Sequence, residues 1–289
     1  MTPLEDDFTS PLAGGPPGEA PAPAPEVPPT PARFIPEDLR VPWSWTHLFF
    51  FLLFGFGVSV VVPGIFAAYF YVARHMNIDQ VQKLLTTNTP LIILMQSVIF
   101  GLLFLFFYVT IVFLHRTSFW FTIGWRPFHP KVLSPGTAAR LSFAAGCGLA
   151  IANGIASVLV HPKGKLPIQE LFKDRTGTFL VMGFAVLVAP LVEETIFRGY
   201  LYPVLARGLG VPAGVVITGI LFGLLHAPQL GNTWALVALI MTVGIIFTYV
   251  RARTGTVFAS YLCHLGYNFT LFFFSALATR GFSRLPPGA

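Results

Sequence analysis

Two adjacent carboxylates and an arginine, Glu193, Glu194 and Arg198, lie inside an apolar run over residues 179–205. The run is long enough to cross the hydrocarbon core of a bilayer, which takes about 20 helical residues. An ionisable side chain at the middle of a spanning helix costs at least about 2.5–3.5 kcal/mol, and such side chains usually mark functional sites. We therefore expect a helical membrane protein in which other segments supply partners for these three residues.

The composition supports a membrane protein. Hydrophobic residues make up 54% of the chain and charged residues 10%, whereas about 25% of a soluble domain is charged. A chain of 289 residues has room for about seven to eight spans, so we predict an all-α, polytopic transmembrane helix bundle. The net charge of +6 fits loops held at an anionic leaflet and gives no reason to expect nucleic acid as a partner. Both cysteines, Cys147 and Cys263, lie in apolar runs and are interpreted as packing residues.

Apolar runs predict seven spanning segments, at residues 45–72, 90–114, 141–160, 179–205, 211–226, 233–250 and 256–279. Pro63 interrupts the first of these, and Trp43 and Trp45 before it are interpreted as interface anchors. Residues 115–140 contain both aromatic and cationic side chains, a mixture that is typical of an interfacial segment. The third segment is rich in Gly and Ala, which lets helices approach closely.

The chain divides by composition into four parts. Residues 1–41 are rich in Pro and Ala and poor in large apolar side chains, which predicts a disordered tail and not a signal peptide. Residues 42–177 are expected to hold N-terminal spans and the interfacial segment, 178–279 the core with the buried charges, and 280–289 a short tail. The distribution of Lys and Arg favours a cytoplasmic N-terminus, although the basic loop over 161–178 opposes it. The Pro-rich tail and sparse cysteines favour a bacterial cytoplasmic membrane.

Three segments place polar residues at a similar depth. On a helical rise of about 1.5 Å per residue, Glu193 lies about 21 Å from Arg207. On the same rise, His226 lies about 22 Å from Val211, and His264 and Asn268 lie about 17 and 23 Å from Arg253, where Arg207, Val211 and Arg253 are taken to share one face of the membrane. Unrelated core histidines would not be expected to share a depth, so the distances predict one site.

Spacing within each segment agrees with a common site. Glu194 and Arg198 are four residues apart, which puts them on one helix face where they can form an ion pair. Glu193 is turned by about 100° around the helix and is expected to face a cavity. A carboxylate, two imidazoles and an amide that converge in a low-dielectric cavity can activate water and stabilise an oxyanion.

At these positions the chain resembles the CPBP intramembrane proteases, a family that groups CAAX prenyl endopeptidases with bacteriocin-processing and self-immunity proteins. The motifs are Glu193-Glu194-x-x-x-Arg198, Phe222-x-x-x-His226 and His264-x-x-x-Asn268, supported by Gly199-Tyr200, Ala227-Pro228 and Arg253-Thr-Gly255. The resemblance covers residues of about 178–275. It implies an intramembrane endopeptidase with a conical catalytic cavity and a membrane-embedded or lipid-anchored protein or peptide as substrate.

The resemblance also implies a role for each motif residue. Glu193 would be the general base that activates water, helped by His226, while His264 and Asn268 would stabilise the oxyanion. Glu194, Arg198 and Phe222 would support them. The family has been described both as metalloproteases and as glutamate-dependent enzymes without a metal. No cofactor is expected with certainty; if zinc is bound, Glu193, His226 and His264 would be its ligands.

Two other classes of protein stay open. Glu193 and Glu194 could form a proton relay in a proton-coupled transporter, although no internal repeat supports this. A non-catalytic binding or immunity protein could keep the same fold for protein contacts. The sequence identifies neither a CAAX tail nor any other cleavage site.

Overall fold

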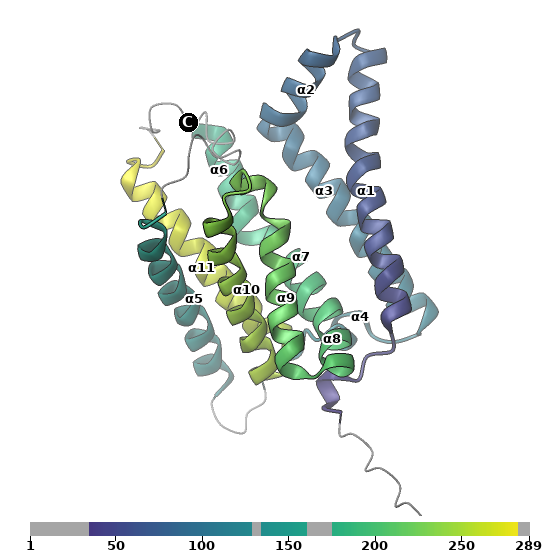
Figure 1. Cartoon of the computed structure of the whole chain (residues 1–289), viewed down its shortest axis with the longest axis vertical. Helices are drawn as coiled ribbons and strands as arrows, with labels where there is room; N and C mark the ends of the chain where they lie inside the picture. Colours follow the sequence, from purple (N-terminus) through teal and green to yellow (C-terminus); the bar gives the residue numbers. More distant parts are fainter. Residues whose placement is uncertain (1–34, 129–133, 161–174, 283–289) are drawn as a thin grey trace, which may run out of the picture. The chain divides into compact units, whose positions relative to one another are not determined.

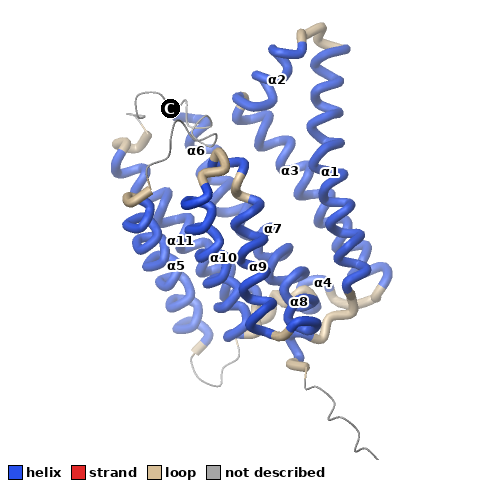
Figure 2. Tube along the Cα trace, in the orientation of Figure 1, coloured by secondary structure: helices blue, strands red, loops and turns tan. Residues whose placement is uncertain are grey.

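The computed structural model describes residues 35–128, 134–160 and 175–282, and within these ranges the chain folds into helices without strands, which confirms the all-α prediction (Figures 1 and 2). The N-terminal half contains η1 (Glu37–Leu39), α1 (Trp45–Val72), α2 (Ile78–Thr87), α3 (Thr89–Tyr108) with its π-helical extension η2 (Val109–Leu114), α4 (Phe119–Thr122) and α5 (Pro135–Ser157). The C-terminal half contains α6 (Arg175–Gly183), η4 (Phe184–Val188), α7 (Ala189–Glu194), η5 (Thr195–Leu201), α8 (Tyr202–Leu209), α9 (Val211–Leu225), η6 (Pro228–Leu230), α10 (Trp234–Thr254) and α11 (Val257–Ala278).

Six helical stretches of the described chain are long and apolar enough to span a bilayer, as expected of an integral membrane protein. They are Trp45–Val72, Thr89–Leu114, Pro135–Ser157, Arg175–Leu209, Trp234–Thr254 and Val257–Ala278. The seventh predicted segment forms α9, which has 15 residues and is shorter than a full span. It begins after Gly210, at φ 93°, and ends before Pro228, whose missing N–H cannot continue a helix.

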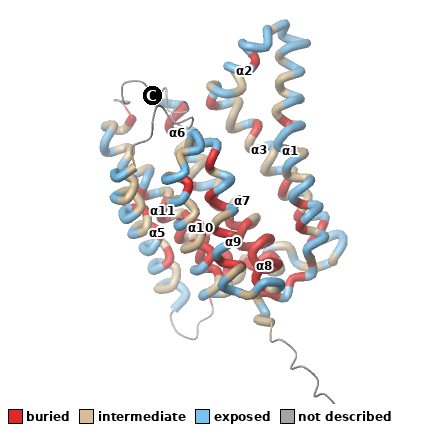
Figure 3. Tube along the Cα trace, in the orientation of Figure 1, coloured by how far each residue is buried: buried red, intermediate tan, exposed pale blue. Residues whose placement is uncertain are grey.

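Burial differs between the two halves (Figure 3). Within the most apolar stretch of α11, 44% of the residues are buried by other parts of the protein, against 22% in α1. Helix α1 exposes large apolar side chains such as Phe49, Phe56 and Ile65, which suit contact with lipid tails. Buried residues gather around α8, α9 and α10, so the protein core lies where the buried charges are found (Figure 3).

Helix α11 packs along α5 and α10, and α10 packs along α9 (Figure 1). The close approach of α5 and α11 depends on glycine, since a Cβ on Gly146 would overlap the carbonyl of Cys263, and one on Gly266 would overlap the carbonyl of Phe143. Small residues are the usual means by which membrane helices pack tightly. The expectation of close packing from the Gly- and Ala-rich third segment is therefore confirmed at Gly146.

The span from Arg175 to Leu209 is interrupted by two π-helical segments, η4 and η5, which the periodicity of the sequence did not predict. Pro190 and Pro203 follow them, each near the start of the next α-helical turn. A proline has no N–H and crowds the carbonyl four residues earlier, and here those carbonyls belong to Val186 in η4 and Gly199 in η5. π-Helical turns of this kind are frequent at functional sites.

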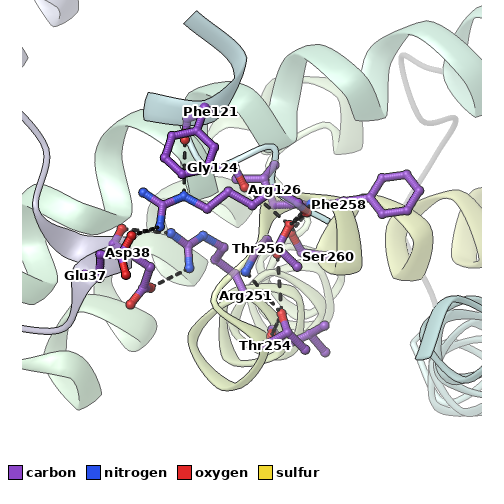
Figure 4. A network of polar contacts seen from close by, with 12 residues as sticks. Glu37, Asp38, Phe121, Gly124, Arg126, Arg251, Thr254, Thr256, Phe258 and Ser260 are labelled. Carbon is purple, nitrogen blue, oxygen red and sulfur yellow. Dashed lines mark hydrogen bonds and ion pairs between the residues drawn. The ribbon is translucent and has the colours of Figure 1, made fainter. Parts of the chain in front are cut away.

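The described chain begins at Ile35, and residues 1–34 of the predicted tail lie outside the described ranges. Residues 35–43, which we call the N-terminal clasp, bind Arg126 and residues of the C-terminal half. Arg251 Nη1 donates to Asp38 Oδ2 at 2.7 Å, with Arg126 and Glu37 forming a second pair at 3.4 Å (Figure 4). Arg207 donates to the carbonyls of Val41 and Trp43 at 2.8 and 2.7 Å.

Several predicted features fall partly outside the described residues. The parts outside are residues 129–133 of the predicted interfacial segment, 161–174 of the charged loop and 283–289 of the C-terminal tail.

One cavity lies between α1, α2 and α3 and is lined by apolar side chains that include Ala67, Tyr71 and Met95. A second lies at the clasp, beside Glu37 and Arg207. Neither is lined by the predicted site residues, so the conical catalytic cavity stays a prediction.

Candidate active site

Glu194 and Arg198 form a fully buried ion pair. Both side chains have 0% exposure, and Arg198 Nη1 donates to Glu194 Oε1 at 2.9 Å. The pairing predicted from their spacing is thereby confirmed. Helix α10 holds the other guanidinium nitrogens, since Nη2 donates to the carbonyl of Gly244 at 2.9 Å and Nε to Thr248 Oγ1 at 3.2 Å. A buried charge is tolerable only when it is paired and hydrogen-bonded in this way.

Aromatic rings enclose the guanidinium. The Cζ atom of Arg198 lies 4.5 Å from the centre of the Phe222 ring and 5.4 Å from that of Phe247. Such contacts favour the cation by about 2 kcal/mol or more when water is excluded. Phe222, on α9, was expected to pack near the site and does so. Phe247, on α10, was not predicted, because one more phenylalanine in an apolar segment carries no distinguishing signal.

His264 lies between the two carboxylates. Its Nδ1 donates to Glu194 Oε1 at 2.9 Å, and its Nε2 lies 3.8 Å from Glu193 Oε2. The second distance is too long for a direct hydrogen bond. A water molecule about 2.8 Å from each atom would bridge it with a bent geometry. The Glu193 side chain is 22% exposed whereas Glu194 is 0% exposed, so the two neighbours differ in access to water and substrate.

His226 joins this cluster through Phe222. It follows the last residue of α9, and its Nδ1 donates to the Phe222 carbonyl at 2.8 Å. Its ring centre lies 4.6 Å from that of Phe222, which in turn lies 5.8 Å from the ring of His264. The Nδ1 bond fixes the imidazole and leaves Nε2 as the nitrogen that can meet a water or a substrate. No hydrogen bond joins His226 to Glu193 within the described chain.

Asn268 lies one helical turn after His264 on α11. Its Nδ2 donates to the carbonyl of Ala185 at 2.8 Å, and Ala185 belongs to the π-helical segment η4. Such a segment departs from the regular ladder of helical hydrogen bonds, so its carbonyls are open to side-chain donors. Asn268 therefore ties α11 to the span that carries Glu193, and its oxyanion role stays a prediction.

Two tryptophans that were not predicted as site residues hold the segment η5, which carries Arg198. Trp125 Nε1 donates to Thr195 Oγ1 at 3.0 Å, and Trp43 Nε1 donates to the carbonyl of Tyr200 at 2.9 Å. Trp43 also stacks on Tyr200, with ring centres 4.9 Å apart, and is 0% exposed. The interpretation of Trp43 as an interface anchor is wrong, because its indole is packed inside the protein. An indole N–H usually finds an acceptor when buried, and here that acceptor lies in η5.

The three residues proposed as conditional zinc ligands were tested against the geometry. Within the described ranges, no three His, Cys, Asp or Glu side chains lie close enough together to hold a metal ion. His264 Nδ1 already donates to Glu194, and its Nε2 lies 3.8 Å from Glu193 Oε2. Glu193, His226 and His264 do not form a zinc site in this arrangement.

Comparison with known proteins bears on the family of the chain. No match was found among curated proteins or solved structures. One family model does match, and the matched residues, 175–270, contain all three motifs and every predicted site residue. That family is described as type II CAAX prenyl endopeptidase Rce1-like, which confirms the resemblance of this chain to the CPBP intramembrane proteases.

Proposed function

We propose that this protein is an intramembrane endopeptidase that hydrolyses a peptide bond with water activated by Glu193. One observation carries the proposal: His264 on α11 lies between a partly exposed carboxylate, Glu193, and a buried carboxylate, Glu194, on another span. The family match over residues 175–270 supports a CAAX-type protease. The role of Glu193 as general base is what the resemblance to the CPBP proteases implies, and the position of His264 beside it supports that role.

Charge balance suggests how the site is set before reaction. Glu193 and Glu194 contribute two negative charges and Arg198 one positive charge, so a protonated His264 makes the cluster neutral. Neutrality matters because an uncompensated charge in a buried cluster costs several kcal/mol. The imidazolium Nε2–H then donates to a bridging water, and that water donates to Glu193 Oε2. Glu193 accepts the proton as the water oxygen attacks the scissile carbonyl carbon.

The tetrahedral intermediate carries a negative charge on the former carbonyl oxygen. His264 Nε2–H is the nearest cationic donor to the attacking water, and Asn268 lies one turn further along the same helix. Donors fixed in advance in a water-poor site stabilise such an oxyanion strongly, and one donor is typically worth about 10²–10³ in kcat. Collapse of the intermediate breaks the C–N bond, and the proton held by Glu193 passes to the leaving amine. His226 assists by holding the water or the substrate through Nε2.

Glu194 and Arg198 act as positioning residues in this scheme. Glu194 fixes the orientation of His264 through Nδ1, and Arg198 is in turn fixed by the Gly244 carbonyl and Thr248. Ser260 on α11 also interacts with the buried Glu194 carboxylate.

We propose a membrane-embedded or lipid-anchored protein or peptide as the substrate, because the candidate base lies in a membrane-spanning segment. We also retain the prediction of a bacterial cytoplasmic membrane with a cytoplasmic N-terminus. No prenylated substrate is proposed, because no described residue identifies one.

Terminal proteomics of a strain that carries Glu193→Gln tests the proposal. The substitution keeps the shape of the side chain and removes the base, so precursors of the substrate should accumulate with uncut termini. Glu37→Gln is the matched control. The Glu37 side chain is 80% exposed at the clasp, so the variant protein should cleave its substrate normally. If an immunity or transport phenotype persists in a folded Glu193→Gln protein and no terminus changes, the protease proposal is wrong.

A further inference from the structure

Three arginines line the cavity at the N-terminal clasp. They come from separate parts of the fold: Arg40 from the clasp, Arg126 from the loop after α4, and Arg207 from the last turn of α8. The cavity has a volume of about 500 Å³, within the range of about 300–1,000 Å³ that is usual for ligand pockets. None of the three arginines belongs to the motifs of the candidate active site. We propose that this cavity binds the phosphate of an anionic phospholipid.

The cavity lies where three membrane spans begin or end. Its wall includes Pro42, just before the span that starts α1, Thr117, just after the span that ends with η2, and Arg207, close to the end of the span that α8 completes. Trp120, the neighbour of the lining residue Phe121 in α4, is 49% exposed, as expected of an aromatic anchor at the membrane surface. The ends of spans lie at the level of the lipid headgroups, so the cavity is at the depth where phosphates are found.

Two of the arginines lack the carboxylate partner that the neighbouring Arg251 has. Arg251 binds Asp38 of the clasp at 2.7 Å. Within the described ranges, no carboxylate lies at ion-pair distance from Arg40 or Arg207. Arg207 is partly buried and donates to two backbone carbonyls, which fix the guanidinium but leave its charge uncompensated. Cations away from bulk water are normally paired with an anion, so these two guanidiniums are suited to an anion from outside the chain.

Glu37 carries the only negative charge among the described residues of the cavity wall. It lies 3.4 Å from Arg126, and its side chain is 80% exposed. An exposed ion pair of this kind contributes little, because water and salt screen it. Three positive charges against one negative charge leave the wall with a net charge of +2, so the cavity attracts anions.

Arg126 is held so that its donors can reach a ligand. Its guanidinium carbon lies 4.3 Å from the centre of the Phe121 ring, and its Nε donates to the Phe121 carbonyl at 3.3 Å (Figure 4). A guanidinium stacked on a ring still presents N–H groups at its edge. Arginine suits phosphate because this planar fork can donate two parallel hydrogen bonds to two of its oxygens.

The rest of the wall favours a lipid over a free phosphate ion or a peptide carboxylate. Apolar side chains, namely Ile35, Val41 and Phe121, line the cavity beside the arginines and suit the glycerol and upper acyl carbons of a lipid. Basic pockets between membrane helices are known to bind anionic headgroups. A bound lipid would link the clasp to α4 and α8, and a ligand that binds the native state alone raises the melting temperature. The proposal does not rest on proteolysis, because it predicts binding and stability and not cleavage.

Native mass spectrometry of the full chain, delipidated and released from detergent micelles, measures the binding of added lipid. Phosphatidylglycerol should bind at least about tenfold more tightly than phosphatidylcholine with the same acyl chains, because only the former has a net negative charge. Arg40→Gln and Arg126→Gln should each weaken the binding of phosphatidylglycerol by about fivefold, the factor that one basic residue contributes at a membrane surface. Arg253→Gln is the matched control, since Arg253 is exposed at the end of α10 and does not line the cavity, and it should leave binding unchanged.

Melting temperatures separate loss of the site from loss of the fold. Arg40 is exposed and donates to the nearby Ile35 carbonyl, so Arg40→Gln should keep the lipid-free melting temperature and reduce the rise caused by phosphatidylglycerol. Inorganic phosphate, and one short peptide with either a free or an amidated C-terminus, are tested in the same assay and should give a smaller rise than the lipid. Equal binding of phosphatidylglycerol by wild type, Arg40→Gln and Arg126→Gln would overturn the proposal. So would a rise with inorganic phosphate, or with the free peptide carboxylate alone, that equals the rise with the lipid.

Discussion

Replacing Arg198 with Met removes the guanidinium that lies between Glu194 and helix α10 while keeping much of the side-chain volume. The Glu194 carboxylate, at 0% exposure, then loses its ion pair and keeps the hydrogen bond from His264. The Gly244 carbonyl loses the donor that Arg198 supplied. Removing one partner of a buried ion pair typically costs about 3–5 kcal/mol, because the other charge stays buried. We expect Arg198→Met to lower the free energy of unfolding by about that amount.

Equilibrium unfolding in mixed detergent micelles, followed by circular dichroism, measures this loss. Arg253→Met is the matched control, since Arg253 is exposed at the end of α10, and its effect should stay within about 0.5 kcal/mol. Adding Glu194→Gln to Arg198→Met removes the stranded charge, so the double variant should be more stable than the sum of the single effects predicts, by about 0.5–3 kcal/mol. A loss below about 1 kcal/mol for Arg198→Met, or strict additivity, would refute a buried and coupled ion pair.

Two further predictions concern packing around the site. Trp43→Phe keeps the stack on Tyr200 but removes the indole N–H, and we expect a loss of about 0.5–1.5 kcal/mol in the same unfolding assay; an unchanged stability would mean that the bond to η5 contributes nothing. Gly146→Ala places a methyl group against the Cys263 carbonyl and should destabilise the protein by about 1–3 kcal/mol, as overpacking does. Its control, Gly148→Ala, meets no atom within 4 Å and should be neutral or stabilising; equal effects of the two would contradict the close contact of α5 with α11.

Local spacing was enough to predict the centre of the site. Glu194 and Arg198 form the ion pair that their i, i+4 spacing predicted. The estimated depths in the membrane correctly placed His264 near Glu193. These predictions succeeded because helical geometry fixes both the face and the height of a residue once a segment is known to span. The number of spans was less certain, since α9 has the composition of a span but 15 residues.

The contacts that fix the site from outside its motifs were not predictable. Gly244 and Thr248 hold Arg198 from α10, and Trp43, which had been interpreted as an interface anchor, holds η5 from the clasp. A backbone carbonyl carries no sequence signal, and the partner of a buried indole depends on tertiary packing. The π-helical segments did leave a signal in Pro190 and Pro203, whose missing N–H groups weaken the regular helix. Their significance became apparent only once the neighbouring carbonyls were located.

The central claim is that water activated by Glu193 cleaves a peptide bond. It is tested most directly by incubating membranes that contain the protein in H₂¹⁸O and reading new C-termini by mass spectrometry. The account predicts that substrate proteins gain cut termini, each with one ¹⁸O atom in the new carboxylate, and that Glu193→Gln membranes lack them while Glu37→Gln membranes do not. Cut termini that persist in a folded Glu193→Gln protein, or that form without ¹⁸O, would contradict it.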